Sequence, residues 1–512
     1  MRQAPVHGMH TAVQFVYMLF LSSSERTFLK AVVQFAYCNP FLPEHTEFER
    51  AALGSDFIEG EPVWSQQVKD PEKPRENVWR IFKKLEPLAD ELRRRLVNGS
   101  SPRSEDLLLY EEAILHLLYQ RFYPKFFAAG LPGKRTATHW AFFHDFHREW
   151  LNYFKINGIE FPSKLEPVSM FAFFRQLQHA FEQIFRDIIG GSLPAARLRG
   201  AIWQSIFTHD MRRYRRVLYQ RMGEFATLIT GPSGTGKELV ARAIAQSRWR
   251  PFREKDLTFD ESAAFFPINI SALSESLVES ELFGHRRGSF TGAVGDRKGW
   301  LETCPAGGSV FLDELGELDQ SIQVKLLRVI ETRTFHPVGD TASLPFHGKL
   351  IAATNRDLAA SGFRQDLYYR LCSDQIVTPS LAEQLADSPE ILSELILHMA
   401  RRVAGPEAEE LAEDVSKWIN QNLGDDYAWP GNYRELDQCV KNVLIRRDYR
   451  PSRAPAQSPM EKLRQNFEAG TMTADELLCR YATIVYRQTG SYEETARRLG
   501  IDRRTVKAKV IT

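Results

Sequence analysis

The stretch that most constrains the fold of this 512-residue chain is ATLITGPSGTGKE, at residues 226–238. A short run rich in β-branched residues leads into a glycine-rich turn, and the turn leads into a helical pattern. Gly231, Gly236 and Lys237 stand at the spacing G-x-x-x-x-G-K. Glycines at such positions let backbone N–H groups approach phosphate oxygens, the helix N-terminus adds positive potential, and the lysine reaches the terminal phosphates. The stretch therefore predicts a strand, a phosphate-binding turn and a helix in direct succession.

Two acids end a second apolar run, GGSVFLDELGEL. If this run is a strand beside the first, Asp313 at its carboxyl end can bind magnesium through water, and Glu314 can polarise the attacking water. Phosphoryl transfer requires both tasks. Glu238 stands where the general motif has Ser or Thr to coordinate the metal, so other groups must hold magnesium.

A third apolar run, KLIAATN, ends in Thr354 and Asn355, polar groups that suit contact with a terminal phosphate. Further along, GFRQDLYYRL presents Arg364 and Arg370 six residues apart. Arginines commonly form solvent-exposed ion pairs. Only the order of the motifs around these two arginines favours a second role for them.

The chain is long enough for several domains, because one hydrophobic core rarely serves so many residues. Residues 1–200 alternate aromatic-rich amphipathic patterns with breakers, which predicts a mostly α-helical N-terminal domain. Over 205–379, short β-branched runs alternate with helical ones, which predicts a parallel sheet covered by helices. Helices follow over 380–449, then a Pro/Ser/Ala-rich linker over 450–473 and a small all-α domain over 474–512.

The composition narrows the classes of protein further. Lys and Arg number 66 against 65 Asp and Glu, a net charge of +1, so no global field draws the chain to nucleic acid or to an anionic membrane. The five cysteines lie far apart and lack zinc spacing, which favours a cytoplasmic location. The apolar run TAVQFVYMLFL is about half as long as a membrane-spanning helix. We expect it to be a core helix rather than a signal peptide, and we expect no membrane association.

The series of motifs in this chain resembles the central domain of sigma-54-dependent transcriptional activators. In order, the motifs are the P-loop, ESELFGHRRGSFTGA, FLDELGEL, IAATNRDL, FRQDLYYRL and WPGNYREL. These bacterial enhancer-binding proteins belong to the AAA+ ATPase superfamily. The resemblance runs from about 205 to 449, and it includes Glu238, because this family carries Glu there. It implies an AAA+ α/β ATPase subdomain at 205–379 and a helical lid at 380–449, with ATP and Mg²⁺ as cofactors.

The resemblance also assigns roles to single residues. Catalytic roles fall to Lys237, Asn269, Asp313, Glu314, Arg364 and Arg370. Nucleotide binding falls to Gly231, Ser233, Gly234, Thr235, Gly236, Lys237, Glu238, Leu239, Thr354, Asn355 and Arg434. Asp313 would hold magnesium through water, and Asn269 would couple the state of Glu314 to a contact loop. The two catalytic arginines would reach the nucleotide of a neighbouring subunit, so a homo-oligomeric ring, typically a hexamer, is expected.

The stretch HRRGSFTGA lies among these motifs without a strand or helix pattern of its own. In the family, a loop with the pattern G-A-F-T-G-A contacts the sigma factor and moves with the nucleotide state. The resemblance assigns this contact to Gly288, Ser289, Phe290, Thr291, Gly292 and Ala293. Ser289 replaces the usual Ala. Glycines allow such a loop to refold, and the phenylalanine and threonine offer an apolar and hydrogen-bonding tip.

One stretch departs from the family. The usual P-P-L-R-x-R appears here as TPSLAEQLAD at residues 378–387, without either arginine. We therefore expect the coupling of lid to core, or the affinity for nucleotide, to differ. NISAL in place of the more usual N-C-A-A-L keeps Asn269 and predicts no change.

The last domain predicts a helix-turn-helix. In TGSYEETARRLGIDRRTVKAKV, one helix ends before Gly490, a short helix spans 493–499, and a third follows the turn at Gly500. Residues 490–512 include six basic and three acidic side chains. This local surplus of positive charge is what attraction to DNA phosphates needs. The domain resembles the Fis-type domain of many of these activators. Contacts to double-stranded DNA are expected from Arg503, Arg504, Thr505, Lys507 and Lys509. A dimerisation or packing bundle is the alternative.

Residues 1–200 resemble no sensor family, and they open without the strand and paired acids of a phosphoacceptor receiver. His144, Asp145 and His147 could approach a metal, but histidines three apart on an aromatic helix more often pack. An apolar ligand or a partner protein would each suit so many aromatic residues. The sequence leaves open the signal, and whether this domain represses or activates the ring.

Together the motifs favour an ATP-hydrolysing transcriptional activator that binds DNA upstream of a promoter and remodels sigma-54 RNA polymerase. Two alternatives stand beside it: an AAA+ remodeller of another client, and a DNA-binding repressor with a vestigial ATPase core. GSFTGA and the basic tail argue against the first alternative. The retention of Lys237, Asp313 and Glu314 argues against the second.

Overall fold

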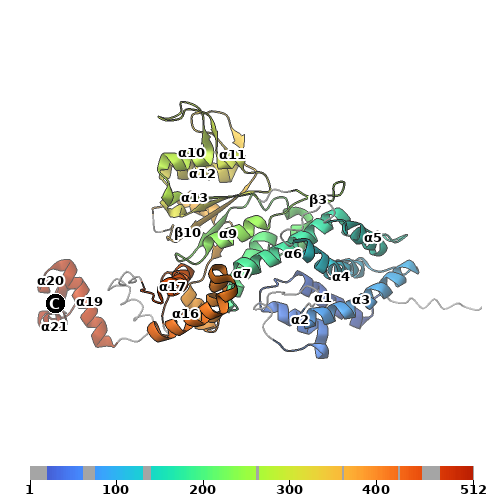
Figure 1. Ribbon diagram of the computed structural model, residues 1–512, viewed down its shortest axis with the longest axis horizontal. Coiled ribbons are helices and arrows are strands. Elements are labelled where there is room, and N and C mark those ends of the chain that lie inside the picture. The colour runs from blue at the N-terminus through green and yellow to red at the C-terminus, as the bar shows by residue number, and fades with distance from the viewer. Residues whose placement is uncertain are drawn as a thin grey trace, which may run out of the picture. The chain divides into compact units, whose positions relative to one another are not determined.

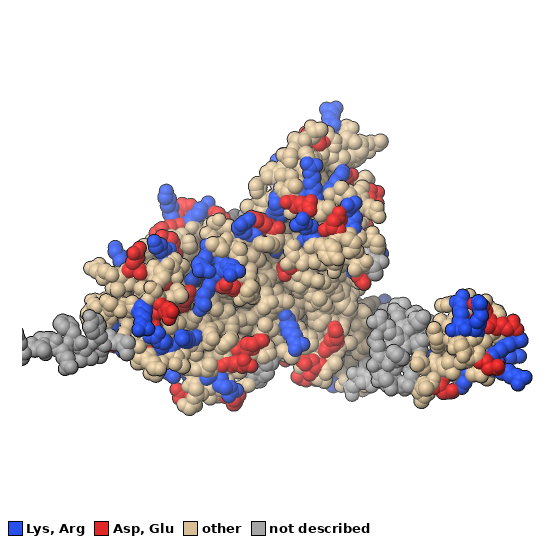
Figure 2. All heavy atoms as spheres, turned by 180° about the vertical axis from the view of Figure 1, so that it is seen from behind, with Lys and Arg blue, Asp and Glu red and all other residues tan. Residues whose placement is uncertain are grey.

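The computed structural model describes residues 20–60, 75–130, 140–260, 264–359, 362–424, 427–451 and 473–510. The core helix expected in TAVQFVYMLFL and the linker expected at 450–473 lie almost entirely outside these residues. The chain divides into two compact units, 1–444 and 445–512. Within the described residues, every helix is too short or too polar to cross a bilayer. Acidic and basic side chains are interspersed over the face shown in Figure 2, as their nearly equal numbers predict.

Helices form the first part of the larger unit (Figure 1). They are α1 (Ser23–Tyr37), α2 (Glu44–Leu53), α3 (Glu76–Val97), α4 (Ser104–Gly130), α5 (Phe143–Phe154), α6 (Pro167–Asp187) and α7 (Leu193–Phe207). On α3 the buried residues recur at steps of three and four: Val78, Ile81, Leu85, Ala89, Leu92 and Leu96. This spacing places them on one face of the helix. The helical N-terminal region expected from the sequence is confirmed.

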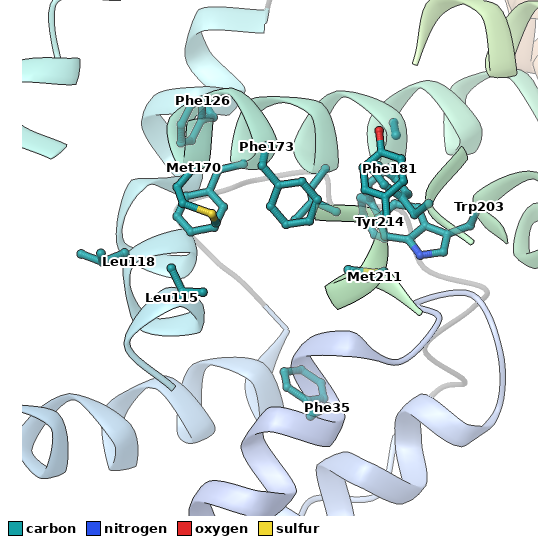
Figure 3. Close-up of a cluster of buried hydrophobic side chains, with 14 of the residues drawn as sticks. Phe35, Leu115, Leu118, Phe126, Met170, Phe173, Phe181, Trp203, Met211 and Tyr214 are labelled. Carbon is teal, nitrogen blue, oxygen red and sulfur yellow. The ribbon is translucent and has the colours of Figure 1, made fainter. Parts of the chain in front are cut away.

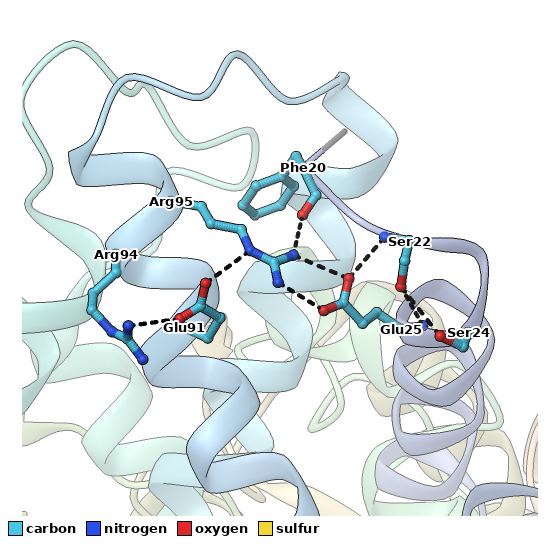
Figure 4. A network of polar contacts seen from close by, with 7 residues as sticks. All are labelled: Phe20, Ser22, Ser24, Glu25, Glu91, Arg94 and Arg95. Carbon is cyan, nitrogen blue, oxygen red and sulfur yellow. Dashed lines mark hydrogen bonds and ion pairs between the residues drawn. The ribbon is translucent and has the colours of Figure 1, made fainter. Parts of the chain in front are cut away.

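A polar network joins α1 to α3 (Figure 4). Arg95 of α3 donates to both carboxylate oxygens of Glu25 on α1, at 3.1 and 3.0 Å, and to the carbonyl oxygen of Phe20 at 2.9 Å. Glu91 accepts a further bond from the same guanidinium. The hydrogen bond from Arg95 lowers the pKa of Glu25. Because Glu25 also completes a capping box with Ser22, one carboxylate fixes both the start of α1 and its position against α3.

A five-stranded parallel sheet follows, in the order β11-β1-β10-β7-β4. Its strands are β1 (Thr227–Thr230), β4 (Phe265–Asn269), β7 (Ser309–Asp313), β10 (Lys349–Thr354) and β11 (Gln375–Val377). The register sets Thr230 beside Thr354 and Asn269 beside Asp313. The carboxyl ends of these strands therefore meet at one edge, where open α/β sheets bind their ligands. The predicted parallel sheet is confirmed.

Helices cover both faces of the sheet, so alternate strand residues enter different cores. Ile351 and Ala353 of β10 pack in the core that holds the P-loop helix, whereas Leu350 and Ala352 pack in the other. The helices around the sheet are α9 (Lys237–Gln246), α10 (Glu275–Phe283), α11 (Trp300–Thr303), α12 (Gln320–Thr332) and α13 (Gln365–Leu371). Burial on both faces explains why β10 is apolar along most of its length.

Short strand pairs and a helical lid complete the larger unit. The paired strands are β2 (Phe252–Arg253) with β3 (Thr258–Phe259), β5 (Gly284–His285) with β6 (Arg297–Lys298), and β8 (Thr334–Phe335) with β9 (Leu344–Pro345). The lid helices are α14 (Leu381–Asp387), α15 (Ile391–Ala404), α16 (Ala408–Asn422) and α17 (Asn432–Arg446). They match the helices predicted after the sheet.

The N-terminal helices share their hydrophobic core with the sheet. Gln176 of α6 donates to the carbonyl oxygen of Ser247, the residue that ends α9, at 2.9 Å, and accepts from the Tyr214 hydroxyl at 2.8 Å. The rings of Phe171 on α6 and Phe252 on β2 lie 4.7 Å apart. The helix α7 runs unbroken through the boundary that the sequence suggested between 200 and 205. The N-terminal helices and the sheet are therefore parts of one body.

The smaller unit contains three helices in its described part: α19 (Ala474–Thr489), α20 (Tyr492–Leu499) and α21 (Arg503–Lys509). Thr473 and Glu476 form a capping box at the start of α19. Gly490 and Gly500 follow the first two helices with positive φ, the usual conformation of a glycine that ends a helix. Val506 of α21 is fully buried. The helices and the turns lie where the sequence predicts them.

We expect Gln176→Leu to lower the denaturation midpoint of the larger unit. The substitution keeps a side chain of similar volume but removes the partner of the Ser247 carbonyl and of the Tyr214 hydroxyl. A buried polar group left unpaired costs about 1–3 kcal/mol of stability. Urea unfolding followed by tryptophan fluorescence measures the loss. Gln34→Leu is the matched control, because Gln34 is exposed on α1. Equal losses in the two variants would contradict a specific contribution from the buried contact.

Candidate functional site

The glycine-rich turn between β1 and α9 lies against two other segments. Gly231 has φ +145°, and a Cβ there would overlap the Thr378 hydroxyl and lie 2.6 Å from the Thr378 carbonyl oxygen. Gly234 has φ +78°, and a Cβ there would overlap the carbonyl oxygen of Gly431. Both positions therefore need glycine for conformation and for space. The turn is held between the end of β11 and the start of α17.

Lys237 lies at the first position of α9, with 8% of its surface exposed. Its ammonium donates to the carbonyl oxygens of Gly231 and Pro232, at 2.9 and 3.0 Å. Burial lowers the pKa of Lys237, and the charges of Glu314 and Asp313 oppose this shift. An ammonium group that is partly desolvated beside backbone N–H groups at a helix start suits a polyphosphate. These residues fit an ATP phosphate chain.

The strand ends bring the predicted polar residues to one edge. Asp313 ends β7 and accepts from the Glu314 N–H at 3.0 Å. Glu314 has φ +55°, a strained conformation for a residue with a side chain. Thr354 is fully buried at the end of β10 and accepts from the Arg356 N–H at 3.1 Å, whereas Asn355 is exposed. Two carboxylates at the end of a strand beside the P-loop fit a magnesium ion and a water molecule.

Asn269 ends β4, directly beside Asp313. Its side-chain oxygen accepts from the N–H of Ser271 at 3.0 Å and from the Ser271 hydroxyl at 2.7 Å. In this arrangement the Asn269 oxygen is engaged with the short helix that follows its own strand rather than with Glu314.

The lid contacts the P-loop through two residues of α17. Arg434 donates to the hydroxyl of Ser233 at 3.1 Å. Asn432 donates to the Ser233 carbonyl oxygen at 2.9 Å and accepts from the Leu381 N–H of α14 at 2.8 Å. Asn432 is 3% exposed; its bond to Leu381 is buried, whereas its bond to the exposed Ser233 is partly buried.

Sequence reasoning missed Asn432 and Thr378. The Thr378 hydroxyl lies 2.7 Å from the Thr235 hydroxyl in the P-loop and also donates to the Thr230 carbonyl. Asn432 stands in the same WPGNYREL stretch that supplied Arg434, and an asparagine after glycine at a helix start was the available signal. Thr378 carried no such signal, because only the pairing of β11 with β1 brings it to the P-loop.

The departing stretch at 378–387 contacts the N-terminal helices. Ser380 and Glu383 form the capping box of α14. At the other end of α14, Asp387 accepts from the N–H of Leu193 on α7 at 2.8 Å. Ser192, which caps α7, donates to Gln384 at 3.4 Å. In this chain the altered stretch thus ties the lid to α7.

Arg364 and Arg370 lie at the two ends of α13. Arg364 pairs with Asp366 at 2.7 Å and Arg370 with Glu331 at 3.2 Å. Their side chains are 40% and 60% exposed. Within the described part of this chain, both arginines therefore point to surface partners and remain accessible to a neighbouring molecule.

The loop at 288–293 lies between β5 and β6, which pair antiparallel. Gly288 donates from its N–H to the Ala293 carbonyl at 2.9 Å, and Ala293 donates to the Phe290 carbonyl at 3.0 Å. Gly288 and Gly292 have φ of +78° and +104°, values that residues with side chains rarely adopt. The tip is therefore a compact turn built on two glycines.

Phe290 and Thr291 form the exposed tip of this turn. The Phe290 ring lies edge-on to His285 with centroids 4.9 Å apart and is 37% exposed. His285 in turn shares a hydrogen bond with Ser280 of α10, at 2.7 Å. Arg286 pairs with Asp340 at 2.7 Å and fixes the base of the loop. A hydrogen bond to His285 and its ring contact with Phe290 thus connect α10 to the aromatic tip.

In the smaller unit, Arg503, Arg504 and Lys507 are exposed on α21. Arg503 pairs with Glu493 at 2.7 Å, and Lys509 pairs with Asp475 of α19. Thr505 is partly buried beside these basic residues. The α21 surface therefore carries the basic residues predicted from the sequence.

The two histidines of α5 contact the ring of Phe143, and the aspartate between them forms ion pairs. Asp145 pairs with Lys125 at 3.1 Å and with Arg148 at 2.8 Å. The ring of His147 stacks on Phe143. The described residues contain no cluster of metal-ligating side chains.

Comparison with known proteins assigns residues 205–377 to the Sigma-54 interaction domain. The transcriptional regulatory protein GlrR of Escherichia coli K12 is 37% identical over 287 residues, which cover 54% of this chain and 58% of GlrR. ZraR of the same strain is 40% identical over 297 residues, covering 56% of this chain and 63% of ZraR. The chain thus spans about three fifths of the length of these relatives. The resemblance predicted from the motifs is confirmed.

The solved structure of NtrX from Brucella abortus in complex with ATP is also similar. It is 22% identical, with a TM-score of 0.37, and the match covers 68% of this chain and 75% of that one. At this TM-score the likeness is weak.

We expect Asn432→Ala to weaken ATP binding about tenfold, because the substitution removes the hydrogen bond that holds α17 against the P-loop and the one that joins α17 to α14 within the lid. Isothermal titration calorimetry with ATP measures the change. Asn442→Ala is the matched control, since Asn442 lies on the same helix and its side chain bonds only to the Gln438 carbonyl among the described residues. Wild-type affinity in Asn432→Ala would mean that nucleotide binding is independent of lid docking.

Proposed function

We propose that this chain, whose residues 205–377 match the Sigma-54 interaction domain, is an ATP-dependent activator of sigma-54 RNA polymerase. In this proposal it binds double-stranded DNA upstream of a promoter in the bacterial cytoplasm. It couples ATP hydrolysis to remodelling of the polymerase, so that promoter DNA melts. The observation that carries the proposal is the coexistence, in one α/β unit, of the P-loop site and the glycine-hinged loop with Phe290 and Thr291 at its tip.

The P-loop residues account for nucleotide binding in this proposal. The N–H groups at the start of α9 and the Lys237 ammonium bind the phosphate oxygens of ATP. Lys237 must leave the carbonyls of Gly231 and Pro232 to do so. Asp313 holds Mg²⁺ through water. Glu314 accepts the hydrogen bond that orients the attacking water.

In this proposal two exposed arginines explain why copies of the chain assemble into a ring. Arg364 and Arg370 lie on the surface of α13 in partly exposed ion pairs, which contribute little to stability. They are thus available to reach the nucleotide of a neighbouring copy. The active form is then a ring, which we take to be a hexamer.

In this proposal the loop at 288–293 contacts the sigma factor of the polymerase. Its tip offers an aromatic ring and a hydroxyl, and its two glycines permit a change of backbone conformation with little strain. The strand β4 ends at Asn269 beside Asp313 and is followed at once by the short helix that precedes α10. A change at the phosphate edge can therefore pass through α10 to His285 and the tip.

The basic face of α21 accounts for the DNA contact. Arg503, Arg504 and Lys507 are exposed on it, and basic side chains on one helix suit the phosphate backbone and base edges of a major groove. Tethering the ring near a promoter is the role that we assign to this unit.

We expect Thr291→Ala to abolish ATP-dependent promoter opening while ATP hydrolysis stays within about twofold of the wild type, because the tip lies outside the nucleotide site. Lys237→Ala should lose both activities, since it removes the phosphate-binding ammonium. The measurements are phosphate release and open-complex formation on a sigma-54 promoter with purified polymerase. Normal promoter opening by Thr291→Ala would contradict the assignment of the loop at 288–293 to contact with the sigma factor. ATP hydrolysis without opening by the wild type would point to another client.

We expect Arg364→Ala and Arg370→Ala each to lower kcat for ATP by about 100-fold or more, as loss of an arginine finger does. Arg401→Ala is the control, because Arg401 forms a comparably exposed pair with Glu409 on the lid. Mixing Arg370→Ala with Lys237→Ala subunits tests action in trans. Mixed rings regain interfaces in which an intact P-loop faces an intact arginine, so partial recovery is expected. No recovery in stable mixed rings would contradict a role in trans.

A further inference from the structure

A cavity of about 490 Å³ lies at the amino ends of the sheet strands. Lys349, the first residue of β10, lines this cavity, as do Gly223 from the segment before β1 and Gly307 from the segment before β7. The P-loop lies at the carboxyl ends of the same strands. Because β10 has six residues and a strand rises about 3.3 Å per residue, the two places are about 16 Å apart along the sheet. The cavity is therefore separate from the nucleotide site.

The N-terminal helices and the α/β part both contribute to the cavity wall. Gln176 of α6 and Ser205 of α7 line it, together with Arg248, which follows α9. Tyr214 lines it as well and donates to Gln176 at 2.8 Å. Figure 3 shows Tyr214 in the cluster of buried hydrophobic side chains that also holds Phe173. A packed hydrophobic core thus supports this polar side of the wall.

Positive charge exceeds negative charge in the wall. Among the described lining residues, the cations are Arg248, Arg250 and Lys349, and the carboxylate is Asp260. Asp260 lies 3.4 Å from Arg253, which is outside the wall, so its charge is already matched. The wall therefore carries a surplus of positive charge.

Two of these cations are buried against backbone carbonyls. Lys349 is 2% exposed, and its ammonium donates to the Phe225 carbonyl oxygen at 2.9 Å and to that of Met222 at 3.5 Å. Arg248 donates to the carbonyl oxygen of Gly308. Burial lowers the pKa of Lys349 to about 8 and the pKa of Arg248 to about 10. Both cations are thus desolvated, and a carbonyl carries no full charge to offset theirs.

The charged groups behind the wall leave the surplus in place. Asp374, whose charge opposes the pKa shift of Lys349, also accepts hydrogen bonds from Ser205 and Thr227. Arg333 is a further cation, and its charge lowers the pKa of both Lys349 and Arg248.

Two other groups near Arg333 add little negative charge. Glu224, which interacts with Arg333, also pairs with Arg221 at 3.1 Å. The Cys304 thiol is neutral at pH 7, because burial raises its pKa to about 11. A buried charge is costly unless it is paired, so an anion in the cavity would relieve a cost that the described residues leave.

We propose that this cavity is a binding site for a small phosphate-bearing anion, held by Arg248 and Lys349. A guanidinium has five N–H donors and an ammonium three. Each can therefore keep its bond to a backbone carbonyl while it binds a phosphate oxygen. Guanidinium and ammonium groups are the usual phosphate ligands of proteins. The volume lies within the range of about 300–1,000 Å³ that is typical of small-molecule sites.

Isothermal titration calorimetry of the full chain with inorganic pyrophosphate, without Mg²⁺, tests the site. Because the P-loop also suits a polyphosphate, we expect two bound molecules per wild-type chain. Lys237→Ala and Lys349→Met should each retain one, since each removes a cation from a different site. Thermal unfolding of both variants shows whether they are folded.

The pattern of losses separates this site from the nucleotide site. One bound molecule in the wild type that Lys237→Ala abolishes and a folded Lys349→Met retains would overturn the proposal. One bound molecule that only Lys349→Met abolishes would support the proposal, while the phosphate-binding role of the P-loop in the proposed function would fail.

Gln220→Glu is a second variant that leaves the buried cations in place. Gln220 is exposed and lines the cavity, so the substitution adds a carboxylate of nearly equal size to the wall. In the Lys237→Ala background it should weaken pyrophosphate binding about fivefold or more, because the carboxylate repels the anion and competes for the same cations. Gln34→Glu is the matched control, since Gln34 is exposed on α1 outside the wall. Equal affinities in the two variants would overturn the proposal.

Competition against pyrophosphate in Lys237→Ala distinguishes the two sources of a phosphate group. Displacement by ribose 5-phosphate at lower concentration than by inorganic phosphate supports a phosphate ester as the occupant. The reverse order supports the inorganic ion. Failure of both to displace pyrophosphate would overturn the assignment to phosphate groups.

Discussion

The close approach of the glycine-rich turn to the segments behind it is the constraint on which the larger unit depends. A Cβ at Gly231 would overlap Thr378, and one at Gly234 would overlap Gly431. These contacts bring the hydroxyl of Thr378 and the amide of Asn432 to the turn, where both form hydrogen bonds. These contacts therefore fix the positions of the sheet, the glycine-rich turn and the lid relative to one another. It is this arrangement that places Lys237 near the acids at the end of β7.

A second constraint is the core that the N-terminal helices share with the sheet. The aromatic side chains of α5 and α6 pack on β2 and β3, as the contacts of Phe143 and Phe171 with Phe252 show. The hydrogen bond between Gln176 and Ser247 then ties α6 to the P-loop helix. Removal of residues 1–200 would cut α7 and expose this core. The N-terminal helices thus pack directly against the part of the chain that carries the P-loop helix.

The altered stretch at 378–387 has a structural counterpart. Where the resembling family has two arginines, this chain has a short helix whose Asp387 accepts from the first turn of α7. An acid at a helix N-terminus is favourable, because it faces unpaired N–H groups and the positive end of the helix dipole. The lid is therefore linked to the N-terminal helices as well as to the P-loop.

The sequence by itself determined the strands β1, β7 and β10, the P-loop between β1 and α9, the glycine-flanked loop at 288–293 and the three C-terminal helices. Their signals are local: glycines at positive φ, apolar periodicity, capping residues and acids at strand ends. Only the tertiary structure decided that Gln176 meets Ser247 and that Asn432 meets Ser233. These partners lie 71 and 199 residues apart. Such contacts depend on the packing of several elements at once, which no local pattern encodes.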